Sequence, residues 1–197
     1  MRLDHQAIQK WIPPKTRVLD LGCGDGTLLR QLTDELNIHG YGVEINPENI
    51  LRCVEICVNV IEQNLDEGLS NFDDLSFDTV IMSQTIQTMH NPDKVLNEML
   101  RIGRQAVVTF PNFAHWRARW HLFWKGRMPV SEHLPYEWYN TPNIHFCTIT
   151  DFEVLCHDMG IKVVDKLVID RNGTSPLVES FPNYFAETAL YLLSKKS

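Results

Sequence analysis

The sequence predicts an α/β fold in which a mostly parallel sheet is covered by helices on both faces. Short apolar runs typical of buried strands alternate along the chain with runs in which apolar residues recur at helical spacing. Strands separated by helices of this length form right-handed βαβ units, which build a mostly parallel sheet. The chain has 197 residues, of which 44% are hydrophobic, so it is long enough to bury a sizeable core. We therefore expect a single domain over residues 1–197.

The first part of the chain contains two predicted pairs of a strand and a helix. Residues 17–21 form a short apolar run after two prolines and predict the first strand. Leucines at helical spacing predict a helix over residues 27–36. Residues 41–45 predict the second strand, and Asn46 and Pro47 then supply a cap and a first-turn proline for the next helix.

The alternation continues in the middle of the chain. A weak third strand is predicted at residues 59–62, and a fully buried fourth strand at residues 77–82. Asn91 and Pro92 repeat the cap and the first-turn proline ahead of an amphipathic helix. Residues 105–110 predict a fifth strand, because they form a nearly continuous apolar run that a proline ends.

The last part of the chain predicts one more helix and two more strands. Residues 150–153 read Thr-Asp-Phe-Glu, the pattern of a capping box, and predict the start of a helix that ends at Gly160. Two late strands are predicted around residues 162–169 and 189–193. The stretch from residue 112 to residue 146 breaks this alternation, so we interpret it as an insertion.

Charge and composition exclude several classes of function. Eighteen Lys and Arg residues against 25 Asp and Glu residues give a net charge of −7, which is unfavourable for a general nucleic-acid-binding surface. No stretch approaches the roughly 18 apolar residues that span a bilayer, and the first residues lack the pattern of a signal peptide. Five cysteines without a CxxC pair, and no HxH or HExxH motif, predict neither disulfides nor a metal site. We expect a cytoplasmic protein with no nucleic-acid or membrane partner.

A glycine-rich turn joins the first predicted strand to the first predicted helix. Residues 20–27 read Asp-Leu-Gly-Cys-Gly-Asp-Gly-Thr. A ligand on this turn meets unpaired backbone N–H groups and the positive end of the helix dipole, and glycines let it approach bare backbone. The dinucleotide-binding pattern GxGxxG would need glycine at Thr27, and the Walker pattern would need a lysine close by. The turn therefore predicts a nucleotide-like ligand of another kind.

An acidic residue, Glu44, stands at the end of the second predicted strand, 22 residues after Gly22. In doubly wound folds, an acid at about this spacing accepts hydrogen bonds from the hydroxyl groups of a ribose. A carboxylate can accept two hydroxyl donors at once, which suits a vicinal diol. We therefore expect Glu44 to hold the sugar of the ligand.

The turn and its acid resemble the first two motifs of class I S-adenosylmethionine-dependent methyltransferases. Longer segments are similar to the family of the methionine biosynthesis protein MetW, and the similarity covers nearly the whole chain. The resemblance implies a Rossmann-like sandwich of seven strands, mostly parallel with the last strand antiparallel, and S-adenosylmethionine or S-adenosylhomocysteine as cofactor. The segments that carry it are residues 11–14, 18–29, 64–69, 110–113, 116–117 and 135–143.

The resemblance implies roles for five residues around the glycine-rich turn. Asp20 and Gly22 would lie by the amino-acid end of the cofactor, where a carboxylate and a carbonyl complement its ammonium group. Gly24 and Gly26 would permit its close approach. Glu44 would bind the ribose.

The resemblance also implies roles for residues that follow the later strands. Ile45 would pack on the adenine, and Asn64 and Leu65 would line its edge. Relatives commonly have an aspartate where Asn64 stands, and the neutral amide lacks the charge assistance that an aspartate gives a hydrogen bond from the exocyclic amine. Ser83 and Gln84 would border the sulfonium end, although they are also ordinary polar residues for the end of a strand.

The sequence shows no clear catalytic group. Residues 83–86 read Ser-Gln-Thr-Ile, where nucleic-acid amino-methyltransferases carry Asn/Asp-Pro-Pro-Tyr/Phe, and the Pro-Cys nucleophile of cytosine methyltransferases is missing as well. Methyl transfer needs mainly positioning and sometimes a base. His90 is placed to face a substrate cleft, but a lone histidine is more often a surface residue. The other candidate bases are His115, His121, His133, His145 and His157.

The insertion, at about residues 112–146, is rich in aromatic and basic side chains, and we interpret it as a lid. Tryptophans recur at every fourth position, so a helix would place them on one stripe flanked by basic residues. The stripe packs on the sheet edge, or presents a surface to a partner protein, or contacts a membrane or nucleic acid. The partner-binding interpretation assigns this surface to Trp116, Arg117, Trp120 and Trp124.

Two functions follow from this sequence. The family resemblance implies an S-adenosylmethionine-binding accessory subunit that works with a homoserine O-acyltransferase in methionine biosynthesis. The alternative is a methyltransferase that acts on a small polar metabolite or on a protein. The intact glycine-rich turn fits both, and the missing acceptor motif leaves the protein's own methyl transfer undecided.

Overall fold

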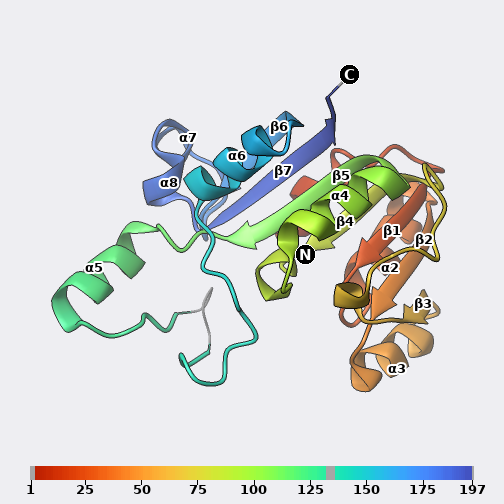
Figure 1. Ribbon diagram of the computed structural model, residues 1–197, viewed down its shortest axis with the longest axis horizontal. Helices are drawn as coiled ribbons and strands as arrows, with labels where there is room; N and C mark the ends of the chain where they lie inside the picture. The colour runs from red at the N-terminus through yellow and green to blue at the C-terminus, as the bar shows by residue number, and fades with distance from the viewer. Residues whose placement is uncertain (1–2, 132–135, 197) are drawn as a thin grey trace.

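The computed structural model describes residues 3–131 and 136–196, and Figure 1 shows that they are organised around one twisted sheet. The strand order is β3-β2-β1-β4-β5-β7-β6. The first five strands run parallel, and β7 is antiparallel to both of its neighbours. This confirms the predicted seven-stranded, mostly parallel sheet with an antiparallel last strand. The strands are β1 (Arg17–Leu21), β2 (His39–Glu44), β3 (Asn59–Glu62), β4 (Phe77–Ser83), β5 (Gly103–Pro111), β6 (Ile161–Ile169) and β7 (Thr188–Lys195).

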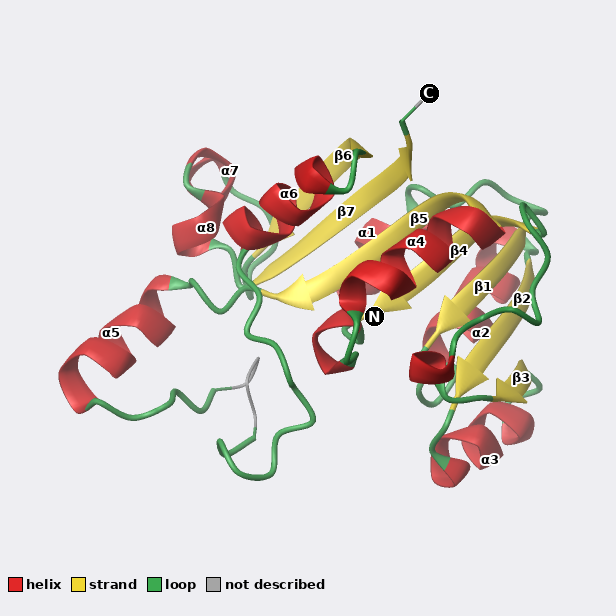
Figure 2. Ribbon diagram, in the orientation of Figure 1, coloured by secondary structure: helices red, strands yellow, loops and turns green. Residues whose placement is uncertain are grey.

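Helices lie on both faces of the sheet (Figure 2), as the alternation of strands and helices predicts. Consecutive strand residues belong to two separate apolar clusters. Val18 and Ile81 face one cluster, and their neighbours Leu19 and Val80 face the other. The helices are α1 (Leu3–Gln9), α2 (Thr27–Leu36), α3 (Pro47–Glu55), α4 (Pro92–Ile102), α5 (Trp116–Lys125), α6 (Ile149–Asp158), α7 (Pro176–Ser180) and α8 (Pro182–Phe185), with short 3₁₀ turns η1 (Leu65–Glu67) and η2 (Ile86–Thr88).

The two asparagine–proline pairs begin helices in different ways. The side chain of Asn46 accepts hydrogen bonds from the backbone N–H groups of Glu48 and Asn49, at 2.9 and 3.4 Å, which confirms the predicted cap of α3. Asn91 precedes α4, and Pro92 occupies its first turn, but the Asn91 side chain makes no cap hydrogen bond. The first turn of α4 therefore depends on its proline rather than on a side-chain cap.

The N-cap of α6 is Thr148, two residues before the predicted capping box at residues 150–153. The helix begins at Ile149, and Thr148 Oγ1 accepts a hydrogen bond from the backbone N–H of Asp151 at 3.2 Å. Thr150, the predicted cap, instead accepts a hydrogen bond from Asn183 Nδ2 through its hydroxyl at 2.8 Å. Both threonines are suited to capping, but the contact with Asn183 engages the hydroxyl of Thr150, and Thr148 caps the helix.

The insertion contains the predicted helix, α5, but this helix does not pack on the sheet edge. It projects away from the body of the molecule (Figure 1), and none of its residues is buried. Phe123 and Trp124 are 74% and 73% exposed. The sheet-edge interpretation of the aromatic stripe is therefore wrong. His133 and Pro135, which carried part of the sequence analysis, lie outside the described residues.

Three aromatic rings in contact join β5, β7 and α6, and removing one of them should destabilise the fold. Phe110 lies 4.8 Å from Phe152 and 5.9 Å from Tyr191, measured between ring centroids, and all three side chains are buried. We expect Phe110→Ala to lower the free energy of unfolding by about 3–5 kcal/mol, because it leaves a cavity in the core. Urea denaturation tests this. The control Phe123→Ala should change stability by less than about 0.5 kcal/mol, because that ring is exposed; equal effects would contradict the prediction.

Candidate functional site

The glycine-rich turn leaves the end of β1 in a conformation that favours glycine. Gly22, Gly24 and Gly26 have φ angles of 75°, 56° and 77°. A Cβ atom on Gly22 would lie 2.6 Å from Thr85 Cγ2, so this position must stay small for packing. A Cβ atom on Gly24 would meet no atom within 4 Å. Gly24 therefore borders open space, where a ligand can approach the backbone.

Glu44 lies at the end of β2 and is fixed by three backbone N–H groups. Its Oε2 accepts a hydrogen bond from Gly24 at 2.9 Å, and its Oε1 accepts from Ile45 at 2.8 Å and Asn46 at 2.9 Å. Hydrogen bonds from N–H groups to a carboxylate are charge-assisted and therefore strong. The carboxylate is 9% exposed and holds the turn after β1 against the end of β2.

A second carboxyl group, that of Asp20, lies buried beneath the same turn. Burial, together with a smaller effect of the nearby Glu44 carboxylate, raises its pKa to about 7. Within the described part of the chain, Asp20 Oδ1 accepts no hydrogen bond. An acceptor of this kind, next to open space, fits the cationic end of a ligand.

Two thiols support the turn from below. Cys53 on α3 donates a hydrogen bond to the carbonyl oxygen of Gly24 at 3.3 Å, and its sulfur lies 3.9 Å from that of Cys23. Burial raises the pKa of both thiols, so they remain neutral. They act as packing groups rather than as nucleophiles.

A cavity of about 430 Å³ opens at the turn. Of the predicted residues around the turn, Asp20, Gly22 and Gly24 line it, whereas Gly26 and Glu44 do not. Among the lining residues that sequence reasoning did not assign are His5 from α1, and Asn49 and Arg52 from α3. These three stand outside the motif, on helices that only the tertiary fold brings to the turn. The lining residues are His5, Asp20, Gly22, Cys23, Gly24, Asp25, Thr27, Leu28, Asn49, Arg52 and Ser83.

The residues predicted to contact the adenine follow β2 and β3. Ile45 exposes 57% of its surface at the end of β2. Asn64 caps η1, where its side chain accepts a hydrogen bond from the backbone N–H of Asp66 at 3.1 Å, and Leu65 is buried. The β2 and β3 ends meet here, because the Gln63 N–H donates to the Glu44 carbonyl oxygen at 3.1 Å. Contacts of these residues with an adenine stay a prediction.

Ser83 and Gln84 follow each other at the end of β4 but face different cavities. Ser83 lines the cavity at the glycine-rich turn, whereas Gln84 lines a neighbouring cavity. The backbone N–H of Gln84 donates to Thr109 Oγ1 at 3.0 Å, and its φ angle is 55°, which turns the chain sharply. The strand end therefore separates two spaces.

His90, the leading candidate base, is held away from both cavities. Its Nδ1 lies 2.7 Å from Asp66 Oδ2, and 70% of its side chain is exposed. It is not among the residues that line either cavity. Among residues 3–131 and 136–196, no three His, Cys, Asp or Glu side chains gather into a metal-binding group, and no helix has the length and apolar character to span a membrane.

Comparison with known proteins identifies the fold. A solved S-adenosylmethionine-dependent methyltransferase from Archaeoglobus fulgidus superposes with a TM-score of 0.69 at 18% identity, over 98% of this chain and 93% of that one. The [4+2]-cyclase SpnF superposes with the same TM-score at 16% identity, over 98% of this chain and 80% of that one. The chain therefore has the fold of the class I S-adenosylmethionine-dependent methyltransferases, a fold that is found with more than one activity.

The family is defined more closely by sequence. The family model described as methionine biosynthesis protein MetW matches residues 2–193. The bifunctional methionine biosynthesis protein MetXA/MetW of Rhodopirellula baltica is 35% identical over 100% of this chain and 33% of its own length. The chain belongs to the MetW family. It spans about a third of the length of the curated relatives that it matches.

The buried Asp20 carboxyl should make folding stability depend on pH. Its pKa is about 7 in the folded protein, against an ordinary value of 3.8, so the folded state holds this proton more tightly than the unfolded state. Stability should therefore fall as the pH rises from about 4 to about 7. Asp20→Asn removes this titration and should raise the free energy of unfolding at pH 8 by about 1–3 kcal/mol relative to the wild type.

Urea denaturation at pH 5 and pH 8 measures this difference. The control is Asp73→Asn, because Asp73 is an exposed residue. It should leave the pH dependence unchanged. If Asp20→Asn is no more stable than the wild type at pH 8, burial does not raise the pKa of Asp20 and this prediction is wrong.

Proposed function

We propose that this protein binds S-adenosylmethionine on the turn at residues 22–26 and acts as an accessory subunit of a homoserine O-acyltransferase in methionine biosynthesis. The observation that carries the partner is the Rhodopirellula baltica relative, whose name joins MetXA with MetW in one bifunctional protein. The family resemblance supplies the acyltransferase as the kind of partner. All five cysteines are free thiols, which supports the cytoplasm as the compartment.

The geometry of the turn supports the cofactor. Glu44 is fixed in place by backbone N–H groups, yet a carboxylate has about four lone-pair sites, so Oε2 can still accept a hydrogen bond from a ribose hydroxyl. Asp20 places a buried acceptor where the ammonium and sulfonium charges of the cofactor would favour its ionised form. When bound, S-adenosylmethionine supplies an activated methyl group.

S-adenosylmethionine is made from methionine, so its binding would report the output of the pathway. In this proposal, the occupied subunit changes the activity of the acyltransferase that makes the methionine precursor. The alternative function is a methyltransferase acting on a small polar metabolite or a protein. It is favoured by the neighbouring cavity at Gln84, which offers space for an acceptor. Transfer of labelled methyl to an acceptor in cell extract distinguishes the two.

Replacing Glu44 tests cofactor binding. Glu44→Gln keeps the shape of the side chain but places an amide N–H₂ against backbone N–H donors, and it removes the charge that holds the diol. We expect the affinity for S-adenosylmethionine to fall about 10- to 100-fold, as for the loss of a charged hydrogen bond. Isothermal titration calorimetry measures this, with a thermal melt to confirm folding.

The matched control is Glu48→Gln, because Glu48 is an exposed acid on the first turn of α3. It should bind S-adenosylmethionine as the wild type does. Wild-type protein that shows no heat of binding would overturn the cofactor proposal. Acyltransferase activity that responds neither to S-adenosylmethionine nor to Glu44→Gln would overturn the regulatory role.

The exposed face of α5 is the surface that we assign to the acyltransferase subunit. Trp120 and Trp124 stack with ring centroids 6.1 Å apart, and Phe123 meets both rings edge to face. Trp116 and Arg117 at the base of the helix form a cation–π pair, with the guanidinium carbon 5.5 Å from the ring centroid. Tryptophan and arginine are the residues most enriched at the centres of protein interfaces.

Truncating the outer tryptophans tests this surface. We expect Trp120→Ala and Trp124→Ala each to weaken binding to the homoserine O-acyltransferase about 30-fold or more, as for interface hot spots of about 2 kcal/mol. Co-purification and surface plasmon resonance with the purified acyltransferase measure the loss. Leu51→Ala is the control, because Leu51 is 60% exposed on α3, which lies at the opposite end of the molecule from α5 (Figure 1). Unchanged binding by both tryptophan variants would disprove the assignment.

A further inference from the structure

A second cavity, of about 540 Å³, lies directly beside the cavity at the glycine-rich turn. Consecutive residues separate the two: Asp4 and Gln84 line the second cavity, and their chain neighbours His5 and Ser83 line the first. A volume of this size is within the range of sites for small molecules. The second cavity is formed by the ends of β4, β5 and β6 and the start of β7, together with α1 and η2.

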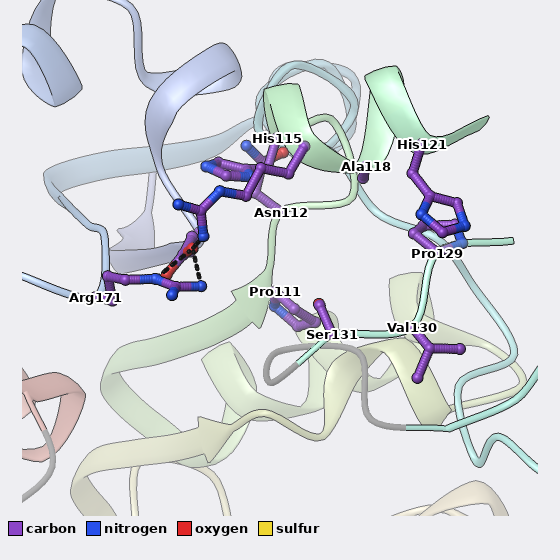
Figure 3. Close-up of a pocket in the computed structure, with 11 residues that line it drawn as sticks. Pro111, Asn112, His115, Ala118, His121, Pro129, Val130, Ser131 and Arg171 are labelled. Carbon is purple, nitrogen blue, oxygen red and sulfur yellow. Dashed lines mark hydrogen bonds and ion pairs between the residues drawn. The ribbon is translucent and has the colours of Figure 1, made fainter. Parts of the chain in front are cut away.

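An ion pair between Arg171 and Glu187 lines the second cavity. Arg171 Nε and Nη2 both lie 3.3 Å from Glu187 Oε1, and the Glu187 side chain is 5% exposed. Arg171 also lines a smaller adjoining cavity of about 210 Å³ (Figure 3), which shares Pro111, Arg171 and Glu187 with the second one. Arg117 Nη1 from α5 lies 3.8 Å from the same Glu187 oxygen.

The lining of the second cavity also includes a buried amide, that of Gln87. Gln87 is 6% exposed, and its Nε2 donates to the Gln84 carbonyl oxygen at 2.8 Å. Its Oε1 accepts no hydrogen bond from the described residues. A buried acceptor without a donor is costly, and a ligand that brings an N–H group relieves this cost.

We propose that the second cavity binds a free α-amino acid through both of its charged groups. The Arg171 guanidinium is a bidentate partner for a carboxylate, and the Glu187 carboxylate next to it is a partner for an ammonium group. An α-amino acid carries these two charges on one carbon, so it matches an arginine and a carboxylate that are in contact. Two further acids, Asp4 and Asp170, also line the cavity; they would attract the ammonium group and repel a ligand that carries only negative charge.

The rest of the cavity fits the side chain of such a ligand. Gln87 supplies an acceptor, Thr88 a hydroxyl group and Pro111 an apolar surface. This proposal does not depend on cofactor binding, because none of the groups that would hold the amino acid belongs to the glycine-rich turn. A bound amino acid would nevertheless lie next to the predicted sulfonium end of the cofactor at Ser83.

Calorimetric titration of the purified protein with L-methionine and L-homoserine tests the proposal. We expect at least one of them to bind with a dissociation constant below about 1 mM, a binding free energy of roughly −4 kcal/mol. N-acetyl-L-methionine lacks the ammonium charge and L-methioninamide lacks the carboxylate, so each should bind at least tenfold more weakly than L-methionine. This comparison uses wild-type protein and therefore does not depend on the folding of a variant.

The variant Arg171→Gln should weaken amino-acid binding at least tenfold, whereas the control Arg104→Gln should not. Arg104 is an exposed arginine that pairs with Asp78 outside the second cavity. Each titration is repeated with saturating S-adenosylhomocysteine, which would fill the first cavity, and in Glu44→Gln. Amino-acid binding should persist in both, so that it can be confirmed even if the cofactor proposal fails.

Three results would overturn the proposal. The first is that wild-type protein binds neither amino acid at 10 mM, on the order of ten times the expected dissociation constant. The second is that N-acetyl-L-methionine and L-methioninamide bind as tightly as L-methionine. The third is that S-adenosylhomocysteine displaces the amino acid while Arg171→Gln leaves its affinity unchanged, which would place the amino acid in the first cavity.

Discussion

The site depends on one buried carboxylate that joins two strands at their carboxyl ends. Glu44 receives the backbone N–H of Gly24 on one side and those of Ile45 and Asn46 on the other. It therefore satisfies donors that the turn after β1 and the start of α3 would otherwise leave unpaired. The glycine-rich turn bends through three residues with positive φ, and the Val43 carbonyl oxygen and the Cys53 thiol hold it together with Glu44.

Asp20 shows the cost of preparing such a site in advance. A carboxyl group whose pKa burial raises to about 7 is unfavourable in its ionised form, and its free oxygen has no donor among the described residues. The fold accepts this cost at a place where a cationic ligand would remove it. The parallel sheet then brings the ends of β1, β2 and β4 to one edge, so the two cavities share a boundary of single residues such as Ser83.

The parts that the sequence could predict are those with local signals. Apolar periodicity identified all seven strands, and the glycine spacing with Glu44 identified the turn, because both patterns act over a few residues or one βαβ unit. The second cavity has no such signal, since Asp4, Gln87, Arg171 and Glu187 come from four distant segments. For the same reason, the pattern favoured Thr150 as the cap of α6, although its contact with Asn183 leaves Thr148 to cap the helix.

The exposed helix α5 presents an energetic problem that a partner would solve. A helix of 10 residues is marginal in water, and α5 buries none of its residues against the sheet. Its first turns are anchored, because Arg119 donates to the Ala114 carbonyl oxygen at 2.5 Å and its guanidinium lies 5.5 Å from the Tyr184 ring centroid. The outer turns carry the stacked rings of Trp120 and Trp124, whose apolar surface is largely exposed. Covering those rings with another protein would remove apolar surface from water and stabilise the helix in the same step, so folding of α5 and recognition of a partner become one process.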